Sequence, residues 1–408
     1  MSPTTEGPSS GLVPTPGFAV PVMYPIFIFG LTFTSRITRS VFFVALLSIA
    51  IFVVFYSTTG HPSTNYIYAT SLWSLIFQSL DYLVIVDPYT EFSLVDQPPS
   101  SSPSALPFLS RLKWSTKLVL SPRGIGFKHE PKSVLPPHPS PQSRLRFIFL
   151  HQLPSLVPYL LLADIGNLLL RSHPSFLPNG PSLSSVGPIM RYINVFIFAL
   201  GSYCTLQLNY IISSIIFTSL HFYSPQDFPS LMGSWGDAYT VRRFWGRTWH
   251  QMMRRWLSSA GTFVVQRTLR IQKGTNLSAY SKLFIAFFIS GLIHQMGDYA
   301  LRHRVPVFDS FWEGGSIKFF VLQTGAIMLE DGVIALGKNA FGIRGNSRAI
   351  RVLGYVWTAS WFAYCLPIWT DPYFHDGMAT GELVSLIGGV WKGDWKGTNL
   401  RFTLPLDY

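Results

Sequence analysis

Long apolar segments recur along this chain and constrain its fold more than any other feature. Charged residues make up 12% of the 408 residues, about half the share that is usual in soluble domains. A helix of about twenty residues crosses the hydrocarbon core of a bilayer and satisfies its own backbone hydrogen bonds there. The apolar segments cover approximately residues 18–34, 40–57, 66–86, 147–170, 192–220, 280–300, 316–337 and 349–370. We therefore expect an all-α, polytopic membrane protein with about eight transmembrane helices plus interfacial or re-entrant helices.

The polar segments between the apolar runs predict the domain organisation and the orientation. Residues 1–17 are rich in Pro, Ser and Thr and contain no basic stretch, so we expect a disordered tail and no signal peptide. The loops 87–146 and 221–279 are strongly basic, which places them in the cytosol and the N-terminus in the lumen. Residues 18–408 are then expected to form one membrane-embedded domain.

Three smaller features refine this prediction. Pro154 and Pro158 fall inside one apolar segment and predict a kinked or broken helix there. Residues 383–391 are apolar but too few to span the bilayer, so they are expected to be interfacial or re-entrant. Cys204 and Cys365 both lie in apolar segments, which favours buried free thiols over a disulfide framework.

The net charge of +12 does not indicate a nucleic-acid-binding protein. The basic residues are dispersed among hydrophobic segments, and no nucleic-acid-binding motif accompanies them. We expect the lipid bilayer to be the main macroscopic partner and no nucleic acid to be bound. The sequence carries no signal for an oligomeric state.

Residues 242–257 combine basic and aromatic side chains at helical spacing. Read as one helix, the segment presents an indole-rich stripe and, on the opposite side, a cationic stripe. The first stripe consists of Trp245, Trp249, Met252 and Trp256, and the second of Arg243, Arg247, His250 and Arg254. Such an interfacial helix would bury its indoles in the acyl boundary. Its arginines would either contact lipid headgroups or bind a phosphate-bearing ligand, because a guanidinium bonds two phosphate oxygens at once.

One histidine, His294, lies inside an apolar segment that is long enough to cross the bilayer. A titratable group is costly to hold at that depth, so it is a functional candidate. On a helix, Ser290 and Asp298 lie one turn away on the same face. Asp298 could accept a hydrogen bond from the imidazole and leave the other ring nitrogen as a base. From the residues alone, a structural histidine, a transporter's proton relay and a catalytic base all remain open.

Four motifs together resemble an enzyme family. Residues 244–250 (FWGRTWH) and 288–294 (FISGLIH) resemble the paired signatures of membrane-bound O-acyltransferases of the wax synthase type. Residues 123–127 (RGIGF) resemble a further motif of the fungal members, and residues 319–331 are similar to the stretch that follows their catalytic helix. The resemblance covers the chain from about residue 66 to residue 372.

This resemblance implies an acyl-CoA-dependent O-acyltransferase in which His294 is the catalytic base and His250 is the second active-site position. In the related sterol and diacylglycerol acyltransferases an asparagine stands at the position of His250. The histidine would therefore either donate a hydrogen bond to the thioester carbonyl or order the cytosolic helix. The supporting residues would be Asp298, Ser290 and Trp249, and the residues that bind the acyl-CoA phosphates would be Arg243, Arg247 and Arg254.

The resemblance also implies the substrates. Fungal members of this length include acetyltransferases of terpenoid and meroterpenoid metabolites, so we expect acetyl-CoA as co-substrate, a lipophilic alcohol as acceptor, and neither a metal nor a bound cofactor. Bulky side chains near His294 would close the acyl site beyond a short chain; they are Phe287, Phe288, Met296 and Tyr299. The alternatives are a long-chain wax or sterol ester synthase and, from another class, a proton-coupled transporter. The expected location is the endoplasmic reticulum membrane.

Overall fold

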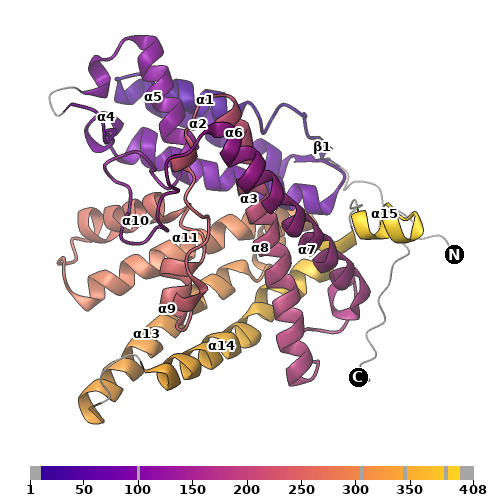
Figure 1. The fold of residues 1–408 in the computed structure, drawn as a ribbon. Coiled ribbons are helices and arrows are strands. Elements are labelled where there is room, and N and C mark those ends of the chain that lie inside the picture. The colour runs from indigo at the N-terminus through magenta and orange to yellow at the C-terminus, as the bar shows by residue number, and fades with distance from the viewer. Residues whose placement is uncertain (1–10, 99–101, 304–306, 343–346, 381–384, 396–408) are drawn as a thin grey trace. The chain divides into compact units, whose positions relative to one another are not determined.

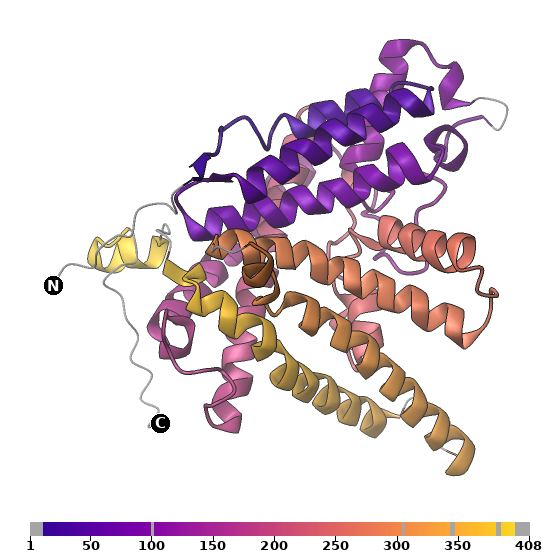
Figure 2. The ribbon, with the colours of Figure 1, turned by 180° about the vertical axis from the view of Figure 1, so that it is seen from behind.

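The computed structural model describes residues 11–98, 102–303, 307–342, 347–380 and 385–395 (Figures 1 and 2). Within these ranges the regular structure is almost entirely helical, and the sheet has two strands of two residues each. The predicted all-α class is therefore confirmed. By their internal contacts the residues divide into two units. The first unit comprises Met1–Pro131 and Met252–Met328, and the second Lys132–Gln251 and Leu329–Tyr408.

The first unit is built on the packing of α3 against α11. Helix α3 (Pro62–Ser79) continues directly into the π-helix η1 (Leu80–Ile85), and α11 (Asn276–Arg302) lies along it (Figure 2). Helix α2 (Arg36–Phe55) also packs on α3, and α10 (Arg254–Thr262) packs on α11. The other helical elements of this unit are α1 (Met23–Gly30), α4 (Pro88–Glu91), η2 (Pro103–Ala105), α5 (Phe108–Leu120), η8 (Phe263–Thr268), α12 (Val307–Trp312) and the first half of α13 (Ser316–Ala340).

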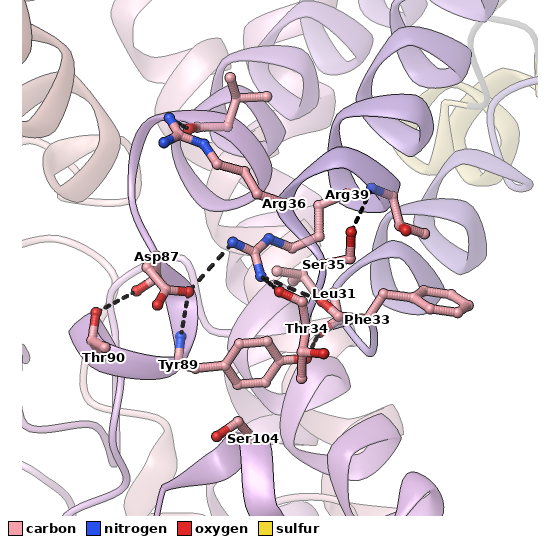
Figure 3. Close-up of polar contacts among 12 residues, drawn as sticks. Leu31, Phe33, Thr34, Ser35, Arg36, Arg39, Asp87, Tyr89, Thr90 and Ser104 are labelled. Atoms are coloured by element: carbon pink, nitrogen blue, oxygen red, sulfur yellow. Dashed lines mark hydrogen bonds and ion pairs between the residues drawn. The ribbon is translucent and has the colours of Figure 1, made fainter.

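A buried arginine fixes the start of α2 (Figure 3). The Arg39 side chain is 3% exposed, and its guanidinium donates to the carbonyl of Thr34 at 2.8 Å and to Oδ1 of Asp87 at 3.3 Å. Its Cζ lies 5.7 Å from the ring centre of Tyr89, whose hydroxyl donates to the carbonyl of Leu31 at 2.7 Å. A buried charge is tolerated when it is paired and hydrogen-bonded. These contacts tie the turn between α1 and α2 to α4.

The second unit contains the longest helix of the described residues, α8 (Pro188–Ser219), which packs along α7 (Leu153–Ser172). The predicted break at Pro154 and Pro158 takes a milder form. Helix α6 (Arg144–Arg146), the π-helix η3 (Phe147–Gln152) and α7 follow one another without interruption. The wider π-helical turn accommodates the backbone ahead of the two prolines, which cannot donate to carbonyls one turn earlier.

The remaining elements of the second unit are short except for α14. They are η4 (Pro174–Phe176), η5 (Pro225–Asp227), η6 (Trp235–Asp237), α9 (Val241–Arg243), η7 (Phe244–Thr248), α14 (Arg348–His375), η9 (Met378–Thr380) and α15 (Leu386–Lys392). Helix α15 covers most of the predicted short apolar segment, and it packs on α7, where Asp164 Oδ2 accepts the backbone N–H of Ile387 at 2.7 Å.

Among the described residues, five helical segments are long and apolar enough to cross a membrane. These segments are Arg36–Phe55, Arg144–Ser172, Pro188–Ser219, Asn276–Arg302 and Asp309–Ala340. The other three predicted spans are helical too, but α1 has only eight residues, and α3 and α14 carry more polar and aromatic side chains. Among the described residues, the helices that are both long enough and apolar enough to span are therefore fewer than the eight that the sequence predicts.

Part of the segment that the sequence predicts to be a disordered tail forms a strand. The expected disorder over residues 1–17 is wrong for residues 11–17, because Val13–Pro14 (β1) pairs in parallel with Ser57–Thr58 (β2). The Thr15 hydroxyl also lies 2.8 Å from that of Ser57. Residues 1–10 lie outside the described residues. Cys204 and Cys365 are buried free thiols, as the sequence predicts.

Candidate active site

His294 lies toward the C-terminal end of α11, where another helix contacts its side chain. Helix α11 begins after Thr275, whose hydroxyl accepts the backbone N–H of Ser278 at 3.2 Å, a usual N-cap interaction. One face of the helix meets α3. There Nδ1 of His294 lies 2.9 Å from Oη of Tyr66, a buried residue. The imidazole is thus held from a second helix, by a residue that the sequence analysis missed.

A phenyl ring covers one face of the same imidazole. Phe320 on α13 is nearly parallel to the His294 ring, with the ring centres 5.0 Å apart and the planes inclined by 6°. Such stacking is favourable between flat rings. Phe320 fixes the plane of the imidazole, and Tyr66 fixes the direction of Nδ1.

Two glycines create the space for these two rings. Gly291 and Gly297 stand three residues before and after His294. A Cβ at Gly297 would lie 2.7 Å from Cε2 of Tyr66, and a Cβ at Gly291 would lie 3.2 Å from Cβ of Phe320 and 2.9 Å from the backbone of α13. Both distances to carbon atoms below 3 Å are too short for non-bonded contact, so only glycine lets α3 and α13 approach α11 this closely.

The two residues predicted to support His294 engage backbone groups. The Ser290 hydroxyl donates to a carbonyl one turn earlier at 3.0 Å. The buried Asp298 accepts the backbone N–H of Ser316 on Oδ2 at 3.2 Å, in the first turn of α13. A carboxylate is favourable there because the first N–H groups of a helix lack intrahelical partners. The partner of Nδ1 is the Tyr66 hydroxyl. Asp298 caps α13 instead, a role that the sequence did not predict.

The predicted amphipathic helix over residues 242–257 is not a single helix. Helix α9 and the π-helix η7 end at Thr248, Trp249 is extended with ψ of 153°, and α10 begins only at Arg254. The two parts belong to different units. The prediction of one continuous indole stripe is therefore wrong.

Competing hydrogen bonds explain the break. The Gln251 side-chain amide donates to the carbonyls of Trp245 and Trp249 at 3.0 and 2.7 Å. The carbonyl of Thr248 accepts the backbone N–H of Gly233 at 2.9 Å. A Cβ on Gly233 would lie 2.0 Å from the carbonyl oxygen of Arg247, so glycine is required for this approach. Carbonyls that would continue the helix are bound by other donors instead.

The aromatic residues of the broken segment are consequently divided. Trp256 is buried in the first unit and stacks on Phe77 with ring centres 6.1 Å apart. The prediction that its indole lies in the acyl boundary is therefore wrong. In the second unit, Trp249 stacks on Phe244 at 5.6 Å, and its ring centre lies 5.7 Å from that of His250. Trp249 and His250 thus belong to the second unit, and Ser290, His294 and Asp298 belong to the first.

The three arginines predicted to bind acyl-CoA differ in their surroundings. In the second unit, Arg243 pairs with Asp237 at 2.5 Å and lies over the ring of Tyr239 at 4.6 Å. Arg247 of the same unit is exposed, and Arg254 is exposed in the first unit. Part of the charge of Arg243 is therefore already compensated by Asp237.

A buried carboxylate anchors the segment that carries His250. Glu330 accepts the backbone N–H of Val241 on Oε1 at 2.5 Å and that of Arg242 on Oε2 at 3.0 Å. Oε1 also accepts the indole N–H of Trp357 at 2.8 Å. Arg242 in turn forms an ion pair with Asp331, the next residue of α13. Glu330 and Asp331, the last two residues of the motif at 319–331, therefore hold the start of the basic segment 242–257 within the second unit.

The profile of the membrane bound O-acyl transferase family matches residues 228–322, a range that contains both His250 and His294. The chain is 34% identical to acetyltransferase eriL of Hericium erinaceus over 95% of this chain and 99% of that protein. It belongs to the membrane-bound O-acyltransferase family. It is also 34% identical to acetyltransferase ple2 of Rhodocybe pseudopiperita over 83% of this chain and 86% of that protein. Acetyltransferase sirH of Emericella nidulans is 32% identical over 64% of this chain and 59% of its own length.

Family membership makes the protein an acyltransferase, and its apolar helices make it an integral membrane protein. The transporter alternative is thereby excluded. The matched range contains two of the four motifs, at residues 244–250 and 288–294.

The motif at residues 123–127 (RGIGF) forms a tight turn in the first unit of this acyltransferase. Gly124 and Gly126 have φ of +69° and +80°, conformations that favour glycine. A Cβ at Gly124 would lie 2.5 Å from the imidazole of His129. Burial, together with the guanidinium of Arg255, lowers the pKa of His129 to about 4. The turn thus packs a neutral imidazole against Phe92, at 4.8 Å between ring centres, and Arg255 also contacts Phe92, at 4.8 Å.

The glycines beside His294 yield a testable prediction. Gly297→Ala and Gly291→Ala should each destabilise the acyltransferase by about 1–3 kcal/mol, the usual cost of forcing extra atoms into a packed interior. Gly325→Ala on α13 is the matched control, because a Cβ there meets no atom within 4 Å and alanine favours the helix. Thermal unfolding in detergent measures the effect. Equal unfolding temperatures for Gly297→Ala and Gly325→Ala would contradict the tight packing.

Proposed function

We propose that this acyltransferase transfers an acetyl group from acetyl-CoA to a hydroxyl of a lipophilic terpenoid or meroterpenoid alcohol. The observation that carries the chemistry is the His294 imidazole, which is fixed in a membrane-spanning helix by Tyr66 and Phe320. Acetyl transfer is supported by two relatives that are named acetyltransferases. The similarity covers 99% of the length of one and 86% of the length of the other.

The proposed reaction is direct attack of the acceptor on the thioester. Nε2 of His294 takes the hydroxyl proton as the oxygen attacks the carbonyl carbon of acetyl-CoA. The tetrahedral intermediate collapses, the carbon–sulfur bond breaks, and the CoA thiolate leaves and receives the proton from the imidazolium. The products are the acetate ester and free CoA, so atoms and charge balance. Holding both reactants beside one fixed base removes much of the entropic barrier.

His250 and the arginines are proposed to serve the acyl donor. His250 would donate a hydrogen bond to the thioester carbonyl, where negative charge develops in the transition state. Arg247 and Arg254 would bind the CoA phosphates, and Arg243 would assist them through the part of its charge that Asp237 leaves uncompensated. The protein would lie in the endoplasmic reticulum membrane with residues 87–146 and 221–279 in the cytosol, where acyl-CoA is available.

His294 is tested by substitution. His294→Ala should lower ester formation about 100- to 10,000-fold, the usual cost of losing a general base, without lowering the amount of folded protein. The assay supplies labelled acetyl-CoA and a panel of terpenoid alcohols to microsomes. His303→Ala on the same helix end is a control, because His303 contacts the backbone of Val54 at 3.1 Å. Turnover above half of the wild-type value in His294→Ala would remove His294 from the mechanism.

The phosphate site is tested by charge reversal. Arg247→Glu and Arg254→Glu should each raise the KM for acetyl-CoA and weaken inhibition by free CoA, because each loses an attraction to phosphate and gains a repulsion. Lys128→Glu is the control, since Lys128 is an exposed cation of another loop. If the arginines serve lipid headgroups alone, protein abundance in the membrane falls and KM stays at the wild-type value.

The acyl length is tested by competition. Microsomes that contain the enzyme receive acetyl-CoA and palmitoyl-CoA at equal concentration with a terpenoid alcohol, and acetyl ester should predominate. A long-chain site gains about 0.8 kcal/mol for each buried methylene, so it would favour palmitoyl strongly. Of the predicted blocking residues, Phe287, Met296 and Tyr299 are buried and Phe288 is 38% exposed. A predominance of palmitoyl ester would replace the acetyl proposal with the wax or sterol ester synthase.

A further inference from the structure

Tyr66 lies in the second turn of α3, far from His294 in sequence, yet its hydroxyl lies 2.9 Å from Nδ1 of that residue. Its side chain is 7% exposed, and Gly297 of α11 provides the space for its ring. Neither the four sequence motifs nor the mechanism proposed above gives this tyrosine a role. The contact joins the two helices whose packing forms the centre of the first unit.

An imidazole needs both orientation and the correct tautomer to act as a base. The terminal torsion of a histidine is broad, so the ring turns easily unless its neighbours restrain it. A neutral imidazole has one N–H and one lone pair, and the partner of one nitrogen decides which nitrogen carries the proton. When Nδ1–H donates to the hydroxyl oxygen of Tyr66, the lone pair lies on Nε2. The stacked ring of Phe320 then keeps Nε2 in one plane.

A neutral hydroxyl suits this position better than a carboxylate does. A carboxylate in an apolar helix contact would need further donors to offset its desolvation. The nearest acidic residue on the same helix, Asp298, accepts a backbone N–H of α13. The hydroxyl oxygen of a tyrosine accepts a hydrogen bond from the imidazole N–H without adding charge, and the ring fills the space between the helices.

We propose that Tyr66 is a positioning residue for catalysis, which holds Nδ1 of His294 so that Nε2 faces the acceptor hydroxyl. This inference rests on the proposed function of His294 as the general base. Tyr66 touches no reacting atom. Its effect on the reaction passes through the imidazole alone.

Tyr66→Phe tests the hydroxyl, because phenylalanine keeps the ring against Gly297 and removes the oxygen. We expect kcat to fall about 10- to 100-fold, by analogy with the loss of the partners that orient metal-bound histidines. The KM for acetyl-CoA and the unfolding temperature in detergent should stay at wild-type values. Tyr68→Phe, the same chemical change two residues along α3, is the matched control and should retain full turnover. A structural role alone predicts full turnover in Tyr66→Phe and a loss only in Tyr66→Leu.

A double-mutant comparison separates this inference from the proposed function. In the His294→Ala background, Tyr66→Phe should have no further effect on the residual turnover, because coupled residues are not additive. More than half of the wild-type kcat in Tyr66→Phe, or an undiminished effect in the His294→Ala background, overturns the role of Tyr66 while leaving His294 as the base. Turnover above half of the wild-type value in His294→Ala alone overturns the proposed role of His294 itself. All rates are normalised to the amount of monodisperse protein from gel filtration. Gly297→Ala displaces the Tyr66 ring, so it should lower kcat as Tyr66→Phe does.

Discussion

The close approach of α3 and α13 to α11 is the constraint on which the candidate active site depends. In a bilayer, helices gain little from the hydrophobic effect when they associate, so contact between their surfaces must supply the attraction. Small residues permit that contact, and Gly291 and Gly297 provide it here on either side of His294. The hydrogen bond between His294 and Tyr66 and the stacking of Phe320 on the imidazole both exist because the helix axes can come this near. A wider spacing would leave the imidazole without either restraint.

The sequence predicted the features that depend on local composition. Apolar length predicted the helical membrane fold, and the motif around His294 predicted a histidine inside a spanning helix. Tyr66 could not be found in this way, because a tyrosine in an apolar segment has no distinguishing spacing, and its partner lies 228 residues away. The signal that was present was Gly297, three residues after His294, since a second glycine within one helical segment indicates that another backbone or ring lies against it.

The segment over residues 242–257 shows why helical periodicity alone failed. Its spacing of indoles and arginines fits one helix, but periodicity does not report which donors compete for its carbonyls. Gln251 and Gly233 capture carbonyls between Trp245 and Trp249, and the helix ends there. Glu330 caps the start of the same segment from a helix about ninety residues later in the chain. Tertiary hydrogen bonds of this kind override local preference and are invisible in a single stretch of sequence.

The buried Arg39 has a consequence for how the protein fits its membrane. A transmembrane helix usually answers a change in bilayer thickness by tilting or kinking, or the lipid beside it thickens or thins. The guanidinium of Arg39 binds the turn that precedes its own helix and the carboxylate of Asp87. Tilting α2 relative to α4 would separate the buried guanidinium from these partners, so this end of α2 is held against α4. Hydrophobic mismatch at this helix must be absorbed by the surrounding lipid or by tilt of the first unit as a whole.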